Sequence, residues 1–558
     1  MQVPDHSACL AHLSESDRVD YLTTLSPGAD IDHRGTSFTG ELLNDLLTAL
    51  TEPATGRLRI GNARFDQASF DGPAVFDRAR FEGPAWFAGA TFGGDAHFTG
   101  TEFGSDAHFE STCFGGPTSF ERAAFSSGAW FVDTELGGTA NFGGVRFSRE
   151  ASFLGAHFNN AAWFGGAEFR GDTWFRRTVF RGDAVFLKAA FERTTAVGPL
   201  VCTGTLHVSE AVFGMPVTIE VAAHALHCRR TRWASTAALR LRHAAVDLSD
   251  AVVEHPVSIA ARSHPFNADG EELPEVDLPS PRNVRVVSLR GVDAAHLVLT
   301  DIDLTDCRFA GTIHLDQLRL EGLYTLAAVP SGLRRRGIRP VRWTPRRTLI
   351  EEHHWRASRS ADPDGWTPPL PQDEALEPAA LAPVYRHLRK SFEDGKHEPG
   401  AADFYYGEME MRRHADDIPW SERTLLTAYW ALSGYGLRSS RAFIWLMTAM
   451  TATVLAMMLW GLPQHDPEPT STGTLNSSGK ITLTTVPPSA ANPNGPYHQR
   501  MSAERFEKSL RVVINSVAFR SSGQDLTTVG AYIEMASRLS EPALLGLALL
   551  AIRNRVKR

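Results

Sequence analysis

The residue types that usually carry chemistry are scattered along this 558-residue chain. No two of its five cysteines form a C-x-x-C pair, and they lie at Cys9, Cys113, Cys202, Cys228 and Cys307. This pattern predicts free thiols in a reducing compartment, with neither a disulfide framework nor a zinc site. His353 and His354 are adjacent, so on a helix they cannot face one metal ion. No catalytic constellation or cofactor motif emerges, and we expect no cofactor and no metal.

One set of residues does show a regular spacing. Tryptophan and histidine recur at multiples of 22 residues, at Trp86, His108, Trp130 and Trp174. Large amphipathic rings exposed in a row form a recognition surface, so these residues favour binding of a protein partner over catalysis. In the alternative interpretation, the same rings cover neighbouring backbone corners and pack against a flanking segment. The elements that hold these rings decide which of them become neighbours.

A phenylalanine repeat between residues 62 and 193 predicts those elements. A large apolar residue returns after alternating steps of five and six residues, beginning with Phe65, Phe70, Phe76 and Phe81. A small residue, mostly alanine, stands two positions before each of them. The spacing fits neither a helix nor a long flat strand, but a short strand, a corner and another short strand. The large and the small residue then both point inward, and glycine suits the corners, where φ > 0 is expected.

The repeated A-x-F-x-x unit resembles the pentapeptide-repeat family. The resemblance implies an all-β fold, a right-handed quadrilateral parallel β-helix with the large and the small residue inside. Two steps of five and two of six give 22 residues per coil, so residues 22 apart lie above one another on the same face. The outward column on one face then consists of Arg64, Trp86, His108, Trp130, Ser152 and Trp174.

Changes in composition divide the rest of the chain. The leucine-rich stretch "SFTGELLNDLLTALTE" predicts a helix that caps the solenoid. The predicted segments are an N-terminal helical cap (1–61), the regular β-helix (62–193), its looser continuation (194–325) with a loop at 262–283, a basic and proline-rich linker (326–379), a cytoplasmic helical hairpin with a juxtamembrane helix (380–437), a transmembrane helix (438–463), a polar extracytoplasmic loop (464–500), and a pore-like helix, re-entrant segment and second membrane helix (501–558).

One stretch predicts a membrane span. Ala442 to Leu462 contains no charged residue, and about 20 apolar residues suffice to cross the hydrocarbon core. Arg438 and Arg441 precede this stretch. The positive-inside rule therefore predicts a plasma-membrane protein whose solenoid and C-terminus are cytoplasmic. The N-terminus lacks the basic start and apolar core of a signal peptide, which agrees with this orientation.

The C-terminal third resembles the linker and membrane segments of bacterial pentapeptide-repeat membrane proteins, on "YRHLRKSFEDG", "GAADFYYGEMEMRRH" and "SGYGLRSSRA". Some of those proteins end in a two-helix potassium-channel-like pore, and actinobacterial ones are sometimes labelled membrane-associated oxidoreductases. The resemblance implies ion-binding backbone carbonyls at Thr527, Thr528, Val529 and Gly530. The motif departs from T-V-G-Y-G, because it reads T-V-G-A-Y and lacks the second glycine. The alternative is a membrane anchor that keeps a pore-like shape.

Three functions follow from these patterns. The leading hypothesis is a membrane-anchored scaffold that presents a rigid β-helix to a cytoplasmic protein partner. The second is a degenerate ion channel, which would need several subunits and therefore a homo-oligomer. The third is a membrane-associated oxidoreductase, although no dinucleotide, flavin or haem motif is visible. The mild net charge of −8 argues against a nucleic-acid partner.

Overall fold

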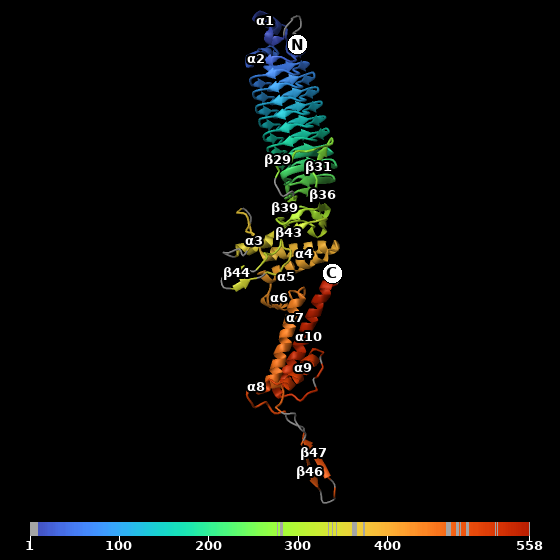
Figure 1. Cartoon of the computed structure of the whole chain (residues 1–558). Coiled ribbons are helices and arrows are strands. Elements are labelled where there is room, and N and C mark those ends of the chain that lie inside the picture. Colours follow the sequence, from blue (N-terminus) through green and yellow to red (C-terminus); the bar gives the residue numbers. More distant parts are fainter. Residues whose placement is uncertain are drawn as a thin grey trace. The chain divides into compact units, whose positions relative to one another are not determined.

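The computed structural model describes residues 9–556 except 276, 279–282, 333, 337–338, 342, 360–364, 372–373, 465–469, 476–478, 480, 487–489, 519 and 522. Two compact units follow one another along the chain, Met1–Phe404 and Tyr405–Arg558. Figure 1 shows the first unit as a stack of short strands followed by helices, and the second as a group of helices with a strand hairpin.

Short parallel strands on four faces build the first unit. The first face contains β1 (Ile31–Asp32), β5 (Ala63–Arg64), β9 (Ala85–Trp86), β13 (Ala107–His108), β17 (Ala129–Trp130), β21 (Ala151–Ser152) and β25 (Thr173–Trp174). The second contains β2 (Ser37–Phe38), β6 (Ser69–Phe70), β10 (Thr91–Phe92), β14 (Cys113–Phe114), β18 (Glu135–Leu136), β22 (His157–Phe158) and β26 (Val179–Phe180).

The other two faces repeat the same arrangement. The third contains β7 (Ala74–Val75), β11 (Ala96–His97), β15 (Thr118–Ser119), β19 (Ala140–Asn141), β23 (Ala162–Trp163) and β27 (Ala184–Val185). The fourth contains β4 (Arg57–Ile60), which pairs with β3 (Thr51–Glu52), then β8 (Arg80–Phe81), β12 (Glu102–Phe103), β16 (Ala124–Phe125), β20 (Arg146–Phe147), β24 (Glu168–Phe169) and β28 (Ala190–Phe191).

The register between neighbouring strands is 22 residues in the regular coils of residues 62–193. Ala63 pairs with Ala85 in parallel, and Trp86 pairs with His108. The unit is a parallel β-solenoid of about 12 turns with roughly 22 residues per coil. The sequence-based prediction of a pentapeptide-type β-helix is thereby confirmed.

Phenylalanine rings fill the interior of the solenoid. Rings on the same face stack from coil to coil, as Phe87 and Phe109 do with 5.0 Å between centroids and 1° between planes. Rings on opposite faces meet edge to face across the interior, as Phe98 and Phe109 do at 5.7 Å. The small residue two positions before each ring is also buried, Ala107 among them. Every coil therefore adds the same dry layer to the core.

The corners differ from the expectation that glycine supplies a positive φ. In the five-residue steps, the second residue after the inward ring has a positive φ, and this position is Gln67 in one corner and Gly89 in another. In the six-residue steps, glycine instead permits close packing between coils. A Cβ at Gly94 would lie 2.8 Å from the carbonyl carbon of Gly72 in the coil before. Close approach of backbones, not φ, requires glycine there.

The solenoid begins inside the segment predicted as the helical cap. Phe38 stacks on Phe70 with 5.2 Å between ring centroids, so the first coil lies within residues 1–61. The predicted helix is α2 (Gly40–Ala49), which is inserted into this coil and buries Leu42, Leu43 and Leu46. Helix α1 (Glu15–Thr24) and a short 3₁₀ helix (Leu10–His12) precede it.

After residue 193 the coils become shorter. Strand β29 (Ala196–His207) pairs with β26 and β27 in succession, so it covers two faces without a corner. Val212 pairs with Arg232, and Ala225 with Ala245, 20 residues apart in both cases. The continuation consists of β30 (Val212–Phe213), β31 (Val217–His227), β32 (Arg232–Trp233), β33 (Ala237–Arg242), β34 (Ala245–Asp247), β35 (Val252–Val253), β36 (Val257–Ala261), β39 (Arg285–Ser288), β40 (Leu297–Thr300), β41 (Asp303–Leu304), β42 (Arg319–Glu321) and β43 (Thr325–Leu326). Two short 3₁₀ helices, Ala294–His296 and Leu315–Gln317, lie among these strands.

The described part of the loop predicted at 262–283 folds against the solenoid wall. Its strands β37 (Asn267–Ala268) and β38 (Glu271–Glu272) form a hairpin. Phe266 and Leu273 are buried in a small cluster with residues of β29 and β31. The Glu275 carboxylate accepts hydrogen bonds from the fully buried Arg242 guanidinium, at 2.7 Å from Nε. Apolar contacts and an ion pair therefore hold the insertion in place.

Helices α3 (Ile350–Ser358) and α4 (Pro378–Asp394) follow the last coils of the solenoid and pack on them. The buried Glu351 carboxylate accepts hydrogen bonds from the backbone amides of Phe309 (2.6 Å) and Ala310 (2.9 Å). Burial raises the pKa of Glu351. Part of the segment predicted as a linker (326–379) is therefore the cap that satisfies amides at the end of the solenoid.

A buried ion network fixes this cap. The Glu352 carboxylate accepts hydrogen bonds from Arg346 (2.6 Å), Arg356 (2.7 Å) and the Tyr385 hydroxyl. Burial opposes the charge, but the two guanidinium groups hold the pKa of Glu352 well below its usual range. Arg346 belongs to the basic run of the predicted linker, whose described part also contains β44 (Arg334–Arg336) and β45 (Arg339–Val341).

The second unit contains two helices that are long and apolar enough to cross a membrane, Ser439–Gly461 and Thr528–Arg553. Its helices are α5 (Glu398–His414, which begins in the first unit), α6 (Trp420–Ser433), α7 (Ser439–Ala456) continued by a π turn (Met457–Gly461), α8 (Tyr497–Arg500), α9 (Ala503–Val517) and α10 (Thr528–Val556). Strands β46 (Thr470–Leu475) and β47 (Ile481–Val486) form a hairpin between α7 and α8. The first candidate span agrees with the one that we predicted.

Candidate functional site

The first face of the solenoid carries the outward row of side chains that the 22-residue register predicts. In the strand pairing from β5 to β25, each of these residues is the direct neighbour of the next. We call this row the aromatic column, and its members are Arg64, Trp86, His108, Trp130, Ser152 and Trp174. The structure thus brings the four residues proposed for partner binding onto one face.

Ring contacts divide the aromatic column into two groups. The Arg64 guanidinium lies 5.0 Å from the centroid of the Trp86 ring, and Trp86 stacks on His108 at 5.9 Å with 6° between planes. Trp130 and Trp174 stack at 6.5 Å between centroids, although Ser152 lies between them in the register. The small side chain of Ser152 lets these two rings approach across a coil.

The exposed fractions of the side chains in the aromatic column agree in part with each of the two interpretations made from sequence. Ser152 is buried, and Trp86, His108 and Trp130 are half-buried, so these rings cover part of the wall. Trp174 is 40 % exposed and ends the column. The column therefore presents ring edges rather than whole faces to solvent, on a backbone held rigid by the core beneath.

His108 gives the aromatic column a titratable group. Its Nδ1 lies 2.8 Å from the Glu110 carboxylate. This hydrogen bond is the main cause that raises the pKa of His108, which also interacts with the charges of Glu110, Asp106 and Asp66. Protonated imidazole beside Trp86 adds a cation–π contribution to the stack.

The inserted hairpin borders the column at its C-terminal end. Asp269, in the turn between β37 and β38, forms an ion pair with Arg176 at 2.7 Å. Arg176 follows Trp174 by two residues in the same coil. The loop predicted from sequence thus supplies a polar rim next to the most exposed ring of the column. No signal in the sequence pairs Asp269 with Arg176.

The four residues predicted as a filter-like segment lie elsewhere than expected. Thr528, Val529 and Gly530 form the first turn of α10, and the Thr527 carbonyl accepts a hydrogen bond from the Ala531 amide at 2.9 Å. Carbonyls in a helix bond to amides along the helix and do not line a re-entrant loop. These carbonyls therefore lie in a helix and not in the re-entrant segment that we expected, because α10 starts earlier than its charged residues indicated; ion binding at these positions stays a prediction. The chain between α9 and α10 is residues 518–527, of which 519 and 522 lie outside the described residues.

Thr527 instead caps the C-terminal end of the first candidate span. Its Oγ1 donates to the Trp460 carbonyl (2.8 Å), and its amide donates to the Gly461 carbonyl (3.0 Å). A Cβ added to Gly530 would collide with the Gly461 carbonyl oxygen, so α10 begins in direct backbone contact with this π turn. Glycine at position 530 permits a helix–helix contact, as small residues do in membrane proteins.

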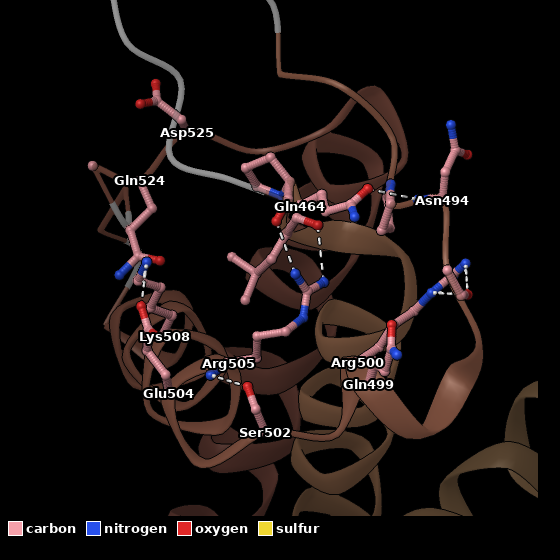
Figure 2. Close-up of a pocket in the computed structure, with 15 residues that line it drawn as sticks. Gln464, Asn494, Gln499, Arg500, Ser502, Glu504, Arg505, Lys508, Gln524 and Asp525 are labelled. Atoms are coloured by element: carbon pink, nitrogen blue, oxygen red, sulfur yellow. Dashed lines mark hydrogen bonds and ion pairs between the residues drawn. The ribbon is translucent and has the colours of Figure 1, made fainter.

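Two arginines complete this cap and line a polar pocket of about 1070 Å³. Arg505 donates to the carbonyls of Met458, Leu462 and Pro463 at 2.8–3.1 Å, and Arg500 donates to that of Leu459 at 2.9 Å. Figure 2 shows the Arg505 guanidinium in the middle of the pocket, with dashed lines to the oxygens that Leu462 and Pro463 contribute. Arginine at a helix C-terminus satisfies free carbonyls and complements the helix dipole.

The bonds from Arg505 and Thr527 therefore hold the C-terminal end of α7 against α9 and the start of α10. Lys508 and Glu504, one turn apart on α9, form an ion pair at 3.1 Å on another side of the pocket. Sequence reasoning missed Arg500 and Arg505, because their partners lie some 40 residues earlier in the chain. Within the described part of the chain, no group of three or more His, Cys, Asp or Glu side chains is placed to hold a metal ion.

Comparison with known families identifies the repeat. The family described as pentapeptide repeats (9 copies) matches residues 65–112 and 153–196. The chain contains a pentapeptide-repeat solenoid. These ranges fall on the most regular coils of the first unit and include Trp86, His108 and Trp174. No curated protein and no solved structure matches the chain.

Proposed function

We propose that the protein is a membrane-anchored scaffold whose pentapeptide-repeat solenoid binds a protein partner in the cytoplasm through the aromatic column. The observation that carries this proposal is the row of tryptophan and histidine rings on one rigid face. Outward positions of a solenoid tolerate many residue types, so three tryptophans at the same outward position need a reason. Aromatic rings at the centre of an interface supply much of its binding energy.

The second unit supports the anchor. Its helices α7 and α10 carry large exposed apolar side chains, including Ile444 (66 % exposed) and Leu539 (73 % exposed). Gly461 and Gly530 meet at one end of the two helices, so the start of α7 and the end of α10 lie on the same side. Arg438 and Arg441, at the start of α7, and Arg553, near the end of α10, are at that side. The positive-inside rule places it in the cytoplasm, and we infer the same compartment for the solenoid.

The test is capture of the partner from native membranes by affinity-tagged full-length protein. A variant with Trp86, Trp130 and Trp174 changed to Ser removes the rings of the column. A matched variant with Val75, Trp163 and Val185 changed to Ser removes outward apolar side chains from the opposite face. We expect the column variant to lose capture by roughly tenfold or more, since hot-spot rings contribute about 2 kcal/mol each, and the matched variant to keep it. Equal capture by the two variants would refute the assignment.

Ion conduction is the second candidate, favoured by the order of a candidate span, a short amphipathic helix and another candidate span in α7, α9 and α10. The protein reconstituted in liposomes tests it by flux of potassium and sodium. Conduction that disappears on changing Gly530 to Val, but not on changing Trp174 to Ser, would favour the channel. Absence of flux from liposomes that contain correctly folded oligomer would leave the scaffold as the remaining proposed function.

A further inference from the structure

Helix α6 exposes an apolar face that none of the described residues of the second unit covers. Trp420 is 80 % exposed and Leu425 is 70 % exposed. The other exposed residues of α6 are small or carry a hydroxyl: Ser421, Thr424, Thr427 and Ala428. Their spacing places all six on one side of the helix, and none is charged. We call this side the outer face of α6.

The opposite side of α6 is already occupied. Leu426 packs in a cluster with Tyr406 and Met409 of α5. The charged residues of α6 lie between the two sides and are half-buried: Glu422 pairs with Arg412, and Arg423 donates to the Ala415 carbonyl at 2.7 Å. Both charges are therefore turned toward α5, away from the outer face.

The two threonine hydroxyls of the outer face are bonded within the helix and do not depend on water. Thr424 Oγ1 donates to the Trp420 carbonyl (2.8 Å), and Thr427 Oγ1 donates to the Arg423 carbonyl (2.7 Å). Exposed threonines of the candidate span α7 make the same bond: the hydroxyls of Thr448 and Thr451 donate to backbone carbonyls one turn before. A hydroxyl satisfied within its helix can face hydrocarbon without an unpaired polar group.

Helix α6 lies next to the start of α7 (Figure 1). The two helices are joined by a tight turn in which Gly434, Tyr435 and Gly436 all have positive φ. The Trp445 indole donates to the Ala431 carbonyl at 3.2 Å, and Arg441 donates to the Trp430 carbonyl at 3.2 Å. The outer face of α6 therefore continues the apolar surface of α7 at its cytoplasmic end.

We propose that α6 lies in the plane of the membrane, with Trp420, Leu425 and Ala428 inserted at the boundary between lipid headgroups and acyl chains. This proposal rests on the membrane anchoring proposed above and adds a second lipid contact to it. Tryptophan is enriched at this depth, and a helix with an uncharged face and charged flanks is the usual form of an interfacial helix. Lipid is the occupant because the outer face is continuous with the lipid-facing surface of α7.

Oxidation by hydroxyl radicals, read out by mass spectrometry, tests the proposal on the full-length protein in phosphatidylcholine–phosphatidylglycerol nanodiscs. Three tryptophans serve as reporters. Trp163 on the solenoid and Trp445 on α7 are matched, since both are 47 % exposed in the protein alone. Trp420 is more exposed than either. We expect Trp420 and Trp445 to be oxidised several-fold more slowly than Trp163.

The outcomes separate this proposal from the anchor on which it rests. Oxidation of Trp420 at least as fast as that of Trp163, with Trp445 protected, would overturn the interfacial helix and leave the anchor. Equal oxidation of Trp445 and Trp163 would overturn both. A phosphatidylcholine with a photoactivatable diazirine, added to the same nanodiscs, identifies what protects Trp420. Lipid adducts on residues 420–428 support the proposal, and protection without lipid adducts means that protein covers α6 and overturns it.

Discussion

The two units of the chain place large apolar side chains in opposite environments. In the solenoid, rings such as Phe87 and Phe120 are fully buried. The outward residues that stand between successive rings in the sequence are mostly polar or small. In the second unit, Ile444 and Leu539 are largely exposed, and the buried positions include Ser509, Ser516 and Thr527. Hydrophobicity alone therefore does not define a core. The spacing of the apolar residues along the chain and the surrounding solvent decide whether these residues face inward or outward.

The largest expected effect comes from removing one ring of the solenoid core. Phe120→Ala leaves a cavity in a stack that has no means to collapse, because strand pairing fixes the coils above and below. We expect a loss of about 3–5 kcal/mol in the free energy of unfolding. Urea unfolding of the full-length protein, followed by circular dichroism of the β-signal, measures this loss.

Leu539→Ala on the exposed side of α10 is the control for that experiment. We expect it to change the stability in nanodiscs by less than about 1 kcal/mol, because lipid replaces the lost contacts. Equal losses from the two substitutions would show that Leu539 lies in a protein core, and the contrast between the units would then fail.

The next largest effect concerns His33, which occupies an inward position above Phe65 at the N-terminal end of the solenoid. Burial lowers the pKa of His33 to about 4, and its side chain contacts the Tyr21 hydroxyl at 3.3 Å. The neutral form is favoured in the folded protein, so stability is complete above the unfolded pKa of about 6.5 and falls as the pH decreases toward 4. The full loss is of order 3 kcal/mol.

Thermal unfolding between pH 4 and pH 7 measures this dependence. His33→Phe extends the ring stack by one layer and removes the titration, so we expect its stability to vary much less over the same range. A variant that keeps the pH dependence of the wild-type protein would assign the effect to another group.

A medium effect is expected where the second unit depends on close backbone contact rather than on apolar burial. Gly530→Ala places a Cβ against the Gly461 carbonyl, whereas Gly546→Ala in the same helix meets no atom within 4 Å. We expect Gly530→Ala to cost about 1–3 kcal/mol and Gly546→Ala to stabilise the helix by about 0.5–1 kcal/mol. Unfolding of reconstituted protein in denaturing detergent, followed by helical circular dichroism, compares the two. Equal effects would mean that α7 and α10 do not meet at Gly461.

The smallest effect on stability is expected in the aromatic column. Trp174→Ser removes a ring that is 40 % exposed and has one ring partner, Trp130. We expect a loss of less than about 1.5 kcal/mol in the urea experiment used for Phe120→Ala, although partner capture decreases. A loss as large as that of Phe120→Ala would assign the column to the fold instead of to binding.

The regular coils could be predicted from sequence because each residue of the repeat has one environment. The alternation of five and six residues fixes the 22-residue register, and with it the neighbours of Trp86 and His108. The pairing of Trp130 with Trp174 could not be foreseen, because it depends on the small size of Ser152 and on rings that lean across a whole coil.

The later parts were predicted less well for a physical reason. Contacts there join residues far apart in sequence, such as Glu351 with Phe309 or Arg505 with Met458. No periodicity in the sequence predicts such contacts. We did not predict α10 as one continuous helix, because the charged residues Glu534 and Arg538 lie within it. In the structure these two residues pair with each other one turn apart at 3.1 Å. A local ion pair of this kind lowers the cost of charge in a long helix.

The central claim is that the aromatic column, on a solenoid held at a membrane, binds a cytoplasmic protein. The most direct test places a photoreactive amino acid at position 174 or, as the matched control, at position 163 on the opposite face, and cross-links in living cells. The account predicts a discrete protein adduct from position 174 in the membrane fraction and none from position 163. Identical adducts from both positions, or none from position 174, would contradict it.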